Sequence, residues 1–258
     1  MFLADESKLN FMKLNEIVNN DLLKIDGSVS YRNSSPFAHI VLDNFLKKNL
    51  IDGLVNEFPD AGEYVNFQAG YAGNFKRAFK PSIEVGSLTT VFYAWMNHPE
   101  FLKYLEDLTG INGLMPDPYY EGGGFHETLR GGSLGIHADF RIHRKLNLHR
   151  RLNLIVYLNE EWDENWGGHL ELWDRQAKGC VKRVAPIFNR AVLFSTDASS
   201  YHGHPQELQC PSDKTRKSIA LYYYTASKSI FKEIPNNNTD YVSDGSLSTS
   251  ENTKMRAK

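Results

Sequence analysis

The sequence predicts a mainly β domain with a helical layer at its N-terminal side. Two observations lead to this fold class. Before Gly110, apolar residues recur at helical spacing around one short β-branched run. After Gly110, short β-branched runs alternate with glycine- and proline-containing turns, at spacings typical of an antiparallel sandwich or barrel. We therefore expect helices packed on a β-sandwich.

The N-terminal elements follow from local signals. "HIVLDNF" (39–45) is rich in β-branched residues and predicts a strand, whereas 47–60 carries an apolar stripe typical of a helix that ends at Pro59. Residues 60–84 look like an aromatic loop. Two helices are expected within 86–111, because Pro99 suits the first turn of the second helix and Gly110 suits its C-terminal cap.

The C-terminal half predicts a series of short strands. They are expected at 151–159, 169–174, 183–188, 190–196 and 217–225. The glycine-rich segment "EGGGFHETLRGGSLG" (121–135) lacks the Gly-Lys-Ser/Thr ending of a phosphate loop, so we interpret it as turns that enter the barrel. Trp162, Trp166 and Trp173 are expected to be packing residues.

We expect one domain, because no linker divides the chain. Residues 1–36 form an N-terminal extension and 37–230 the domain, helical over 37–112 and β over 113–230. The Asn-, Ser- and Thr-rich segment 235–258 is expected to be a disordered tail without catalytic residues.

Composition narrows the class of protein. The 258 residues carry a net charge of −2 and 41% hydrophobic residues, which disfavours nucleic-acid binding and global disorder. The chain shows neither a secretory signal nor a stretch of 18 apolar residues, so we expect a cytoplasmic protein without membrane contact. Cys180 and Cys210 are expected to be free thiols. The oligomeric state is left open.

A pair of possible metal ligands stands in "LGIHADF". His137 and Asp139 are two residues apart, so on an extended segment both side chains point to the same face. His-x-Asp alone is weak, but His202, 63 residues after Asp139 (139 to 202), follows a predicted strand and could meet the pair. Two histidines and one carboxylate leave coordination positions open, which suits a non-haem Fe(II) oxygenase. The cysteines lack the spacing of a structural zinc site.

Arg216 opens the last predicted strand. Taken alone it would be a surface cation, but beside such a triad its guanidinium fork could hold a carboxylate through two hydrogen bonds.

These segments, in order, resemble a known family. "GIHADF", "RRLNLIVYLNEEWDENWGGHLELWD", "VAPIFNRAVLFSTDASSYHGHP" and "TRKSIALYYYT" are similar to the prolyl-4-hydroxylase-like branch of the 2-oxoglutarate/Fe(II)-dependent dioxygenases, over about residues 115–228. The resemblance implies a double-stranded β-helix, or jelly roll, with the site near one open end.

The resemblance also implies roles for individual residues. His137, Asp139 and His202 would bind iron, and Arg216 would hold the far carboxylate of 2-oxoglutarate. Tyr157 matches a position whose hydroxyl often joins that contact. Asn153 lies four residues before Tyr157 on the same strand face, so it either shares the pocket or makes cross-strand packing.

Other polar residues keep more than one interpretation. His204 could replace His202 as a ligand, contact substrate or do neither; the family pattern favours His202, which follows an aromatic residue. The basic stretch 141–151 is either a solvated loop or a rim that attracts an acidic substrate. His39, His98 and His126 are expected to be ordinary surface or core residues.

The implied activity is hydroxylation of an unactivated C–H bond with Fe(II), 2-oxoglutarate and O2, releasing succinate and CO2, with ascorbate as reductant. The Asp139 carboxylate occupies the site that a halide would need, which favours hydroxylation over halogenation. The substrate would be a prolyl residue of a protein or peptide, a free amino acid or a small natural product. Alternatives are an inactive cupin-like metal- or ligand-binding module and, third, a nucleic-acid oxygenase that uses the basic stretch.

Overall fold

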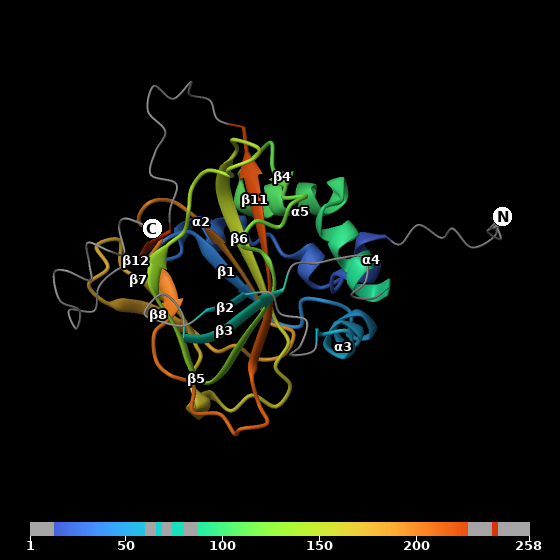
Figure 1. Cartoon of the computed structure of the whole chain (residues 1–258). Coiled ribbons are helices and arrows are strands. Elements are labelled where there is room, and N and C mark those ends of the chain that lie inside the picture. The colour runs from blue at the N-terminus through green and yellow to red at the C-terminus, as the bar shows by residue number, and fades with distance from the viewer. Residues whose placement is uncertain (1–12, 60–65, 69–73, 80–86, 227–238, 242–258) are drawn as a thin grey trace.

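The structure is a computed structural model that describes residues 13–59, 66–68, 74–79, 87–226 and 239–241. Figure 1 shows α3, α4 and α5 on one side of the long strands and β7, β8 and β12 on the other. The helices are α1 (Leu14–Ile17), α2 (Ser28–Asn33), α3 (Lys48–Asn56), α4 (Ser87–Met96) and α5 (Pro99–Thr109), with 3-10 turns η2 (Leu22–Lys24) and η4 (Glu164–Trp166). The strands are β1 (His39–Leu42), β2 (Asn66–Gln68), β3 (Asn74–Phe79), β4 (Met115–Pro116), β5 (Gly124–Ala138), β6 (His149–Tyr157), β7 (Leu170–Trp173), β8 (Cys180–Val184), β9 (Ala191–Ser195), β10 (His202–His204), β11 (Arg216–Thr225) and β12 (Asp240–Tyr241).

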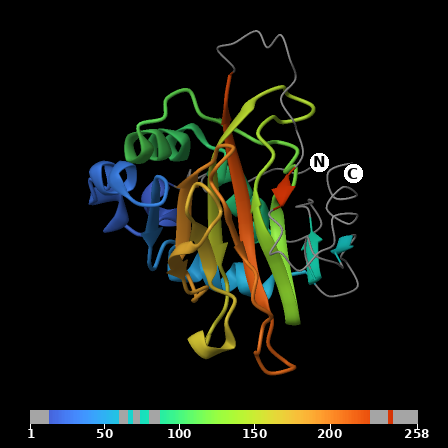
Figure 2. The same cartoon turned by 90° about the vertical axis from the view of Figure 1, so that its left-hand side faces the viewer.

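Antiparallel strands form two facing sheets that share β5. The larger sheet runs β1–β9–β6–β11–β5, and β3 and β2 continue it beyond β5. The smaller sheet contains the second half of β5 with β10, β7 and β8, and β12 pairs on the other edge of β5. Figure 2, turned by 90°, shows β11 running along the length of the barrel-like body. The expected mainly β jelly roll with a helical layer is confirmed.

The main core lies between the helices and the larger sheet. Leu54 of α3, Phe92 of α4 and Phe101 of α5 are fully buried there against Leu152 and Val156 of β6. Alternation along β6 turns the other side chains, including Asn153 and Tyr157, toward the space between the sheets. One strand therefore supplies both a packing face and a face that lines the site.

The expected limits of α5 are confirmed. Pro99 occupies its first turn, and the N-cap His98 accepts a hydrogen bond from the Glu100 N–H at 3.3 Å. Gly110 ends the helix with φ of +74°, a left-handed conformation that glycine adopts without steric cost.

Three expectations about local structure are wrong. Residues 60–84 were expected to be a loop, but β2 and β3 form within them. β3 pairs with the free edge of β5 although apolar and polar residues do not alternate along its sequence. Segment 121–135 was expected to be turns, but most of it belongs to β5, which bends at Gly131 (φ +74°) from one sheet into the other. The strand expected at 183–188 is β8, which ends at Val184 before Pro186, a residue without an N–H for the ladder.

The expected division of the chain stays a prediction. Ile17, Val18 and Tyr31, which precede the expected domain start at residue 37, are buried in the main core. The expected tail, 235–258, lies outside the described residues except for Thr239 and β12. Among the described residues, no helix is both long enough and apolar enough to cross a membrane.

The expected roles of the other marked residues agree with the contacts. Trp162 and Trp166 pack with Leu208 and Cys210, and the Trp173 indole donates to Glu171 at 2.9 Å. Cys180 and Cys210 are free thiols.

The turn before β9 ties the N-terminal segment to the larger sheet. The buried Asn189 amide accepts from the Leu46 N–H at 2.8 Å and donates to the Leu46 carbonyl oxygen at 2.9 Å. We predict that N189A lowers the free energy of unfolding by about 2–4 kcal/mol, because two buried backbone groups lose their partner.

The exposed Asn147 is a matched control, since its backbone has nearly the same left-handed φ (53° against 57°). N147A should cost much less in urea unfolding. Equal losses in the two variants would assign the effect to backbone strain instead of the side-chain hydrogen bonds.

Candidate active site

The register between β5 and β10 brings the two expected histidine ligands together. His137 near the end of β5 is the direct antiparallel partner of His202 at the start of β10. Side chains of directly paired residues project on the same face, and the two imidazole centroids lie 4.5 Å apart. Gly203 permits this close approach, because a Cβ at that position would lie 2.7 Å from the Gly135 carbonyl oxygen.

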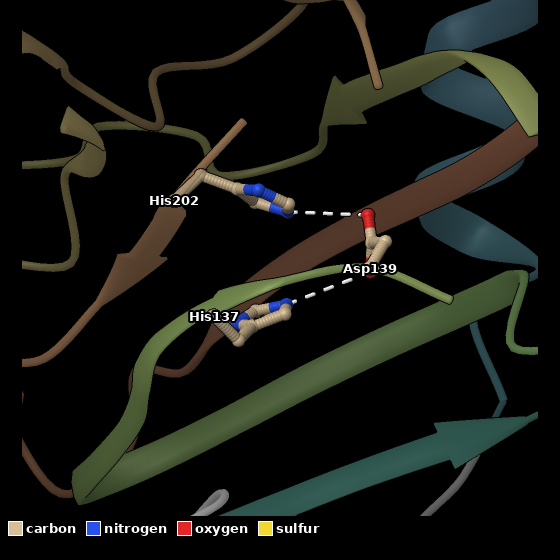
Figure 3. A group of neighbouring side chains, drawn as sticks. All are labelled: His137, Asp139 and His202. Atoms are coloured by element: carbon tan, nitrogen blue, oxygen red, sulfur yellow. Dashed lines mark ion pairs between the residues drawn. The ribbon is translucent and has the colours of Figure 1, made fainter. Parts of the chain in front are cut away.

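Asp139 completes a three-residue cluster with these histidines. Its Oδ1 lies 3.6 Å from His137 Nε2 and its Oδ2 lies 3.4 Å from His202 Nε2. Figure 3 shows both rings directed at the carboxylate, which follows β5 directly. The three potential ligand atoms lie within 4.8 Å of one another, and the side chains are at most 11% exposed.

Backbone contacts fix the orientation of both rings. His137 Nδ1 lies 2.8 Å from the Gly135 carbonyl oxygen, and His202 Nδ1 lies 2.9 Å from that of Ser200. A carbonyl oxygen can only accept, so each Nδ1 carries the hydrogen and each Nε2 presents a lone pair to the cluster. Two imidazole nitrogens and a carboxylate with this arrangement suit a ferrous ion with open positions.

Asp139 is held as a carboxylate by two further side chains. Arg150 Nη2 and Asn153 Nδ2 both donate to Oδ2, at 2.9 and 2.7 Å. Burial alone would raise the pKa of Asp139, but the Arg150 charge, followed by the two histidines, holds it well below the usual value of 3.8. The structure thus places Asn153 in contact with the carboxylate.

Arg150 is itself enclosed. Its guanidinium lies 3.4 Å from the ring centroid of Tyr222 and 4.6 Å from that of Phe140, and its Nε donates to Asn153 at 2.8 Å. The basic stretch 141–151 is therefore not simply a solvated loop. Arg150 enters the site, and the fully buried His143 pairs with Asp117 at 3.0 Å.

Beside the cluster lies a cavity of about 380 Å³ between the two sheets. The cluster and Arg216 both contribute to its wall. Arg216 is 5% exposed; its Nε donates to the Gly168 carbonyl oxygen at 2.7 Å and its Nη2 to the Tyr157 hydroxyl at 3.3 Å. Burial lowers the pKa of this guanidinium. In the described part of the chain, no carboxylate forms an ion pair with it.

A second cation faces the cavity from β3. Thr128 of β5 pairs with Arg216 on one side and with Lys76 on the other, so the three residues form one row across three strands. Burial, followed by the charge of Arg216, lowers the pKa of Lys76 to about 8. In the next row, His126 also lines the cavity. No local pattern in the sequence indicated Lys76, because β3 was not expected.

The remaining marked histidines differ in their surroundings. His39 is buried outside the cavity, with Nδ1 2.9 Å from the Phe37 carbonyl oxygen, and His98 caps α5. His126, expected to be an ordinary residue, lies at the cavity wall and approaches the Gly122 carbonyl oxygen at 3.2 Å. His204 also lines the cavity, on the same strand as His202.

Part of the chain is similar to a known family. Residues 123–224 match the model of the 2OG-Fe(II) oxygenase superfamily. This segment contains the His-Asp-His cluster and Arg216, whereas Lys76 lies outside it. The resemblance to the 2-oxoglutarate/Fe(II)-dependent oxygenases and their prolyl hydroxylase branch is confirmed. This family match and the chemistry of the ligand set confirm Fe(II) and 2-oxoglutarate as the expected cofactors.

Relatives of this superfamily include hydroxylases. Mouse prolyl 3-hydroxylase OGFOD1 is 34% identical over 77 residues, which is 28% of this chain and 14% of the relative's length. A prolyl hydroxylase from Trichoplax adhaerens, solved with a hypoxia inducible factor peptide fragment, has a TM-score of 0.58 at 18% identity, covering 79% of this chain and 90% of its own.

Two further solved structures share the fold. A Pseudomonas putida prolyl-4-hydroxylase has a TM-score of 0.54 at 17% identity, covering 78% of this chain and all of its own (100%). HygX from Streptomyces hygroscopicus, solved with nickel, 2-oxoglutarate and hygromycin B, has a TM-score of 0.54 at 11% identity, covering 84% of this chain and 97% of its own.

The contact of Asn153 with Asp139 generates a prediction about metal affinity. N153A should weaken Co(II) binding by roughly 10–100-fold, because the carboxylate loses a partner that orients it. Asn159, buried just beyond the same strand and bonded to the Pro186 carbonyl oxygen at 2.6 Å, is the matched control. N159A should lower stability but leave the Co(II) Kd unchanged in a spectroscopic titration; equal Kd values for N153A and wild type would contradict this role.

Proposed function

We propose that this protein is an Fe(II)- and 2-oxoglutarate-dependent hydroxylase that releases succinate and CO2. His137, Asp139 and His202 hold the iron, and Arg216 with Tyr157 holds the far carboxylate of 2-oxoglutarate. One observation carries the proposal. A buried guanidinium that has no carboxylate partner among the described residues lines the same cavity as a cluster of two histidines and one carboxylate.

Electrostatics supports a dicarboxylic co-substrate. A buried charge is costly unless an opposite charge accompanies it, and the carboxylate of Asp139 is already paired with Arg150. Arg216 and Lys76 therefore leave the cavity with unbalanced positive charge. An anion that reaches from the metal to Arg216 would offset this charge, as 2-oxoglutarate would.

The bound iron would supply oxygen activation, coupled to oxidative decarboxylation of 2-oxoglutarate. The protein's own residues do the positioning. Asp139 stays ionised beside Arg150, and the two Nε2 lone pairs point inward. Because the Asp139 carboxylate occupies the position that a halide would need, hydroxylation is favoured over halogenation. Asn153 acts through Asp139, as a positioning residue. Ascorbate as reductant stays a prediction.

A prolyl residue of a protein or peptide is the substrate that the relatives support. OGFOD1 is a prolyl 3-hydroxylase, and the solved neighbours include prolyl-4-hydroxylases, so the position of hydroxylation on the ring stays open. A small natural product is the second candidate, since HygX was solved with hygromycin B. The third candidate is a free amino acid, whose carboxylate Lys76 could bind in the cavity.

The proposed cofactor roles predict distinct failures. H137A, D139A and H202A should form no succinate above background with Fe(II), ascorbate and 2-oxoglutarate. R216A should raise the KM for 2-oxoglutarate by about 100-fold, since hydrogen bonds to charged groups contribute about 1.5–3 kcal/mol each. Arg190, paired with Asp43 at the surface, is the control.

A wild-type protein that is loaded with iron and forms no succinate would instead favour the inactive cupin-like module. If H202A stays active while H204A does not, the choice of the second histidine ligand is wrong.

Lys76 generates a prediction about charge preference. Below a pH of about 8 its ammonium is charged, so turnover should favour a substrate with a free carboxylate over the matching amide. This preference should fall as the pH rises through about 8, because the depressed pKa makes Lys76 neutral there. L-Proline against prolinamide, measured as succinate formed between pH 6.5 and 9, is the assay. The same fall in K76M would exclude Lys76 as its cause.

A further inference from the structure

His204 differs from the other buried histidines in the described part of the chain. His39, His137, His143 and His202 each have a polar partner within 3.0 Å of a ring nitrogen. His204 is only 3% exposed, yet neither Nδ1 nor Nε2 has a hydrogen-bond partner among the residues that the structure describes. Leaving a buried polar group unsatisfied destabilises a fold, so such a side chain is expected to have a partner in the working state of the protein.

The direction of His204 follows from the strand. His202 and His204 are two residues apart on β10, so both project toward the space between the sheets, and both line the cavity. The unsatisfied imidazole therefore faces the region where the co-substrate is proposed to bind.

Arg216 lies at the same end of the cavity as His204. It is anchored by the Gly168 carbonyl oxygen, two residues before Leu170, and Leu170 lies on β7, the strand paired with β10. After burial, Arg216 is the strongest influence that lowers the pKa of His204. Whether neutral or protonated, an imidazole carries at least one N–H donor.

Tyr157 contacts Arg216 from the core. Its hydroxyl oxygen accepts from Arg216 Nη2 at 3.3 Å. Arg216 and His204 both line the cavity, so a guanidinium and an imidazole can donate to one anionic group there.

We propose that His204 donates a hydrogen bond to the far carboxylate of 2-oxoglutarate, beside Arg216 and Tyr157. This inference rests on the proposed function and extends it to a residue that neither the metal cluster nor the proposed Arg216–Tyr157 contact includes. In this proposal His204 binds the co-substrate, and His202, on the same strand, binds the metal.

The test is calorimetric titration of 2-oxoglutarate into the Mn(II)-loaded full chain. H204V should raise the Kd by about tenfold or more, the loss expected for a hydrogen bond to a charged group. H204N, which keeps an amide donor, should recover part of the affinity. Pyruvate, a 2-oxo acid without a far carboxylate, should bind the wild type and H204V equally.

Thermal unfolding provides a second readout. Without 2-oxoglutarate, H204V should have a higher Tm than the wild type, because it removes an unsatisfied buried group. H39V, the matched control outside the cavity, should lower the Tm and leave the 2-oxoglutarate Kd unchanged, since it removes a satisfied histidine.

The outcomes separate the two proposals. If the wild type binds 2-oxoglutarate and H204V binds it within twofold, or if H204V weakens pyruvate equally, the role of His204 is wrong and the hydroxylase proposal stands. If the Mn(II)-loaded wild type binds no 2-oxoglutarate, the proposed function fails and the role of His204 fails with it.

Discussion

The antiparallel pairing of β5 with β10 is the constraint on which the site depends. It sets His137 opposite His202, and the chain that leaves β5 carries Asp139 to the same point. A shift of one residue in this register would turn one histidine to the other face of the sheet and separate the ligand atoms. The close contact at Gly203 and the ring hydrogen bonds to backbone oxygens fix both the register and the direction of the lone pairs.

Charge is distributed unevenly around His137 and His202. On one side, Asp139 and Arg150 neutralise each other within a shell of aromatic rings. On the other, Arg216 and Lys76 face the cavity, and the donors around Arg216 are only partly used. The site thus has one part in which opposite charges cancel and another that is positive, and this separation would give the proposed co-substrate a single orientation.

Much of the site could be predicted from the sequence, because its signals are local. The two-residue spacing of His137 and Asp139 shows at once that they share a face, and the flanking segments resemble an oxygenase family strongly enough to add His202 and Arg216. The limits of α5 were equally local, since proline and glycine act on their own backbone. The structure brings these residues together as expected, and their roles in binding iron and co-substrate stay predictions.

What could not be predicted depends on pairing between distant segments. Apolar and polar residues do not alternate along β3, which forms because it pairs with the edge of β5. The residues around Lys76 in the sequence therefore do not indicate that it lines the site. The long β5 was hidden by glycines that look like turns but permit its bend. Arg150 lies in a basic stretch that resembles a solvated loop. Only the fold shows that its guanidinium donates a hydrogen bond to Asp139.

The crossing of β5 between the sheets has a consequence for how such an enzyme can diversify. The proposed metal ligands and the arginine proposed to bind the co-substrate lie within one continuous stretch of about a hundred residues, 123–224, whereas Lys76 lies on an edge hairpin from an earlier part of the chain. An edge hairpin can be exchanged or lengthened without breaking a ladder between the ligand strands. Changes in the β2–β3 hairpin could therefore alter substrate selectivity while the proposed metal and co-substrate residues in 123–224 stay the same.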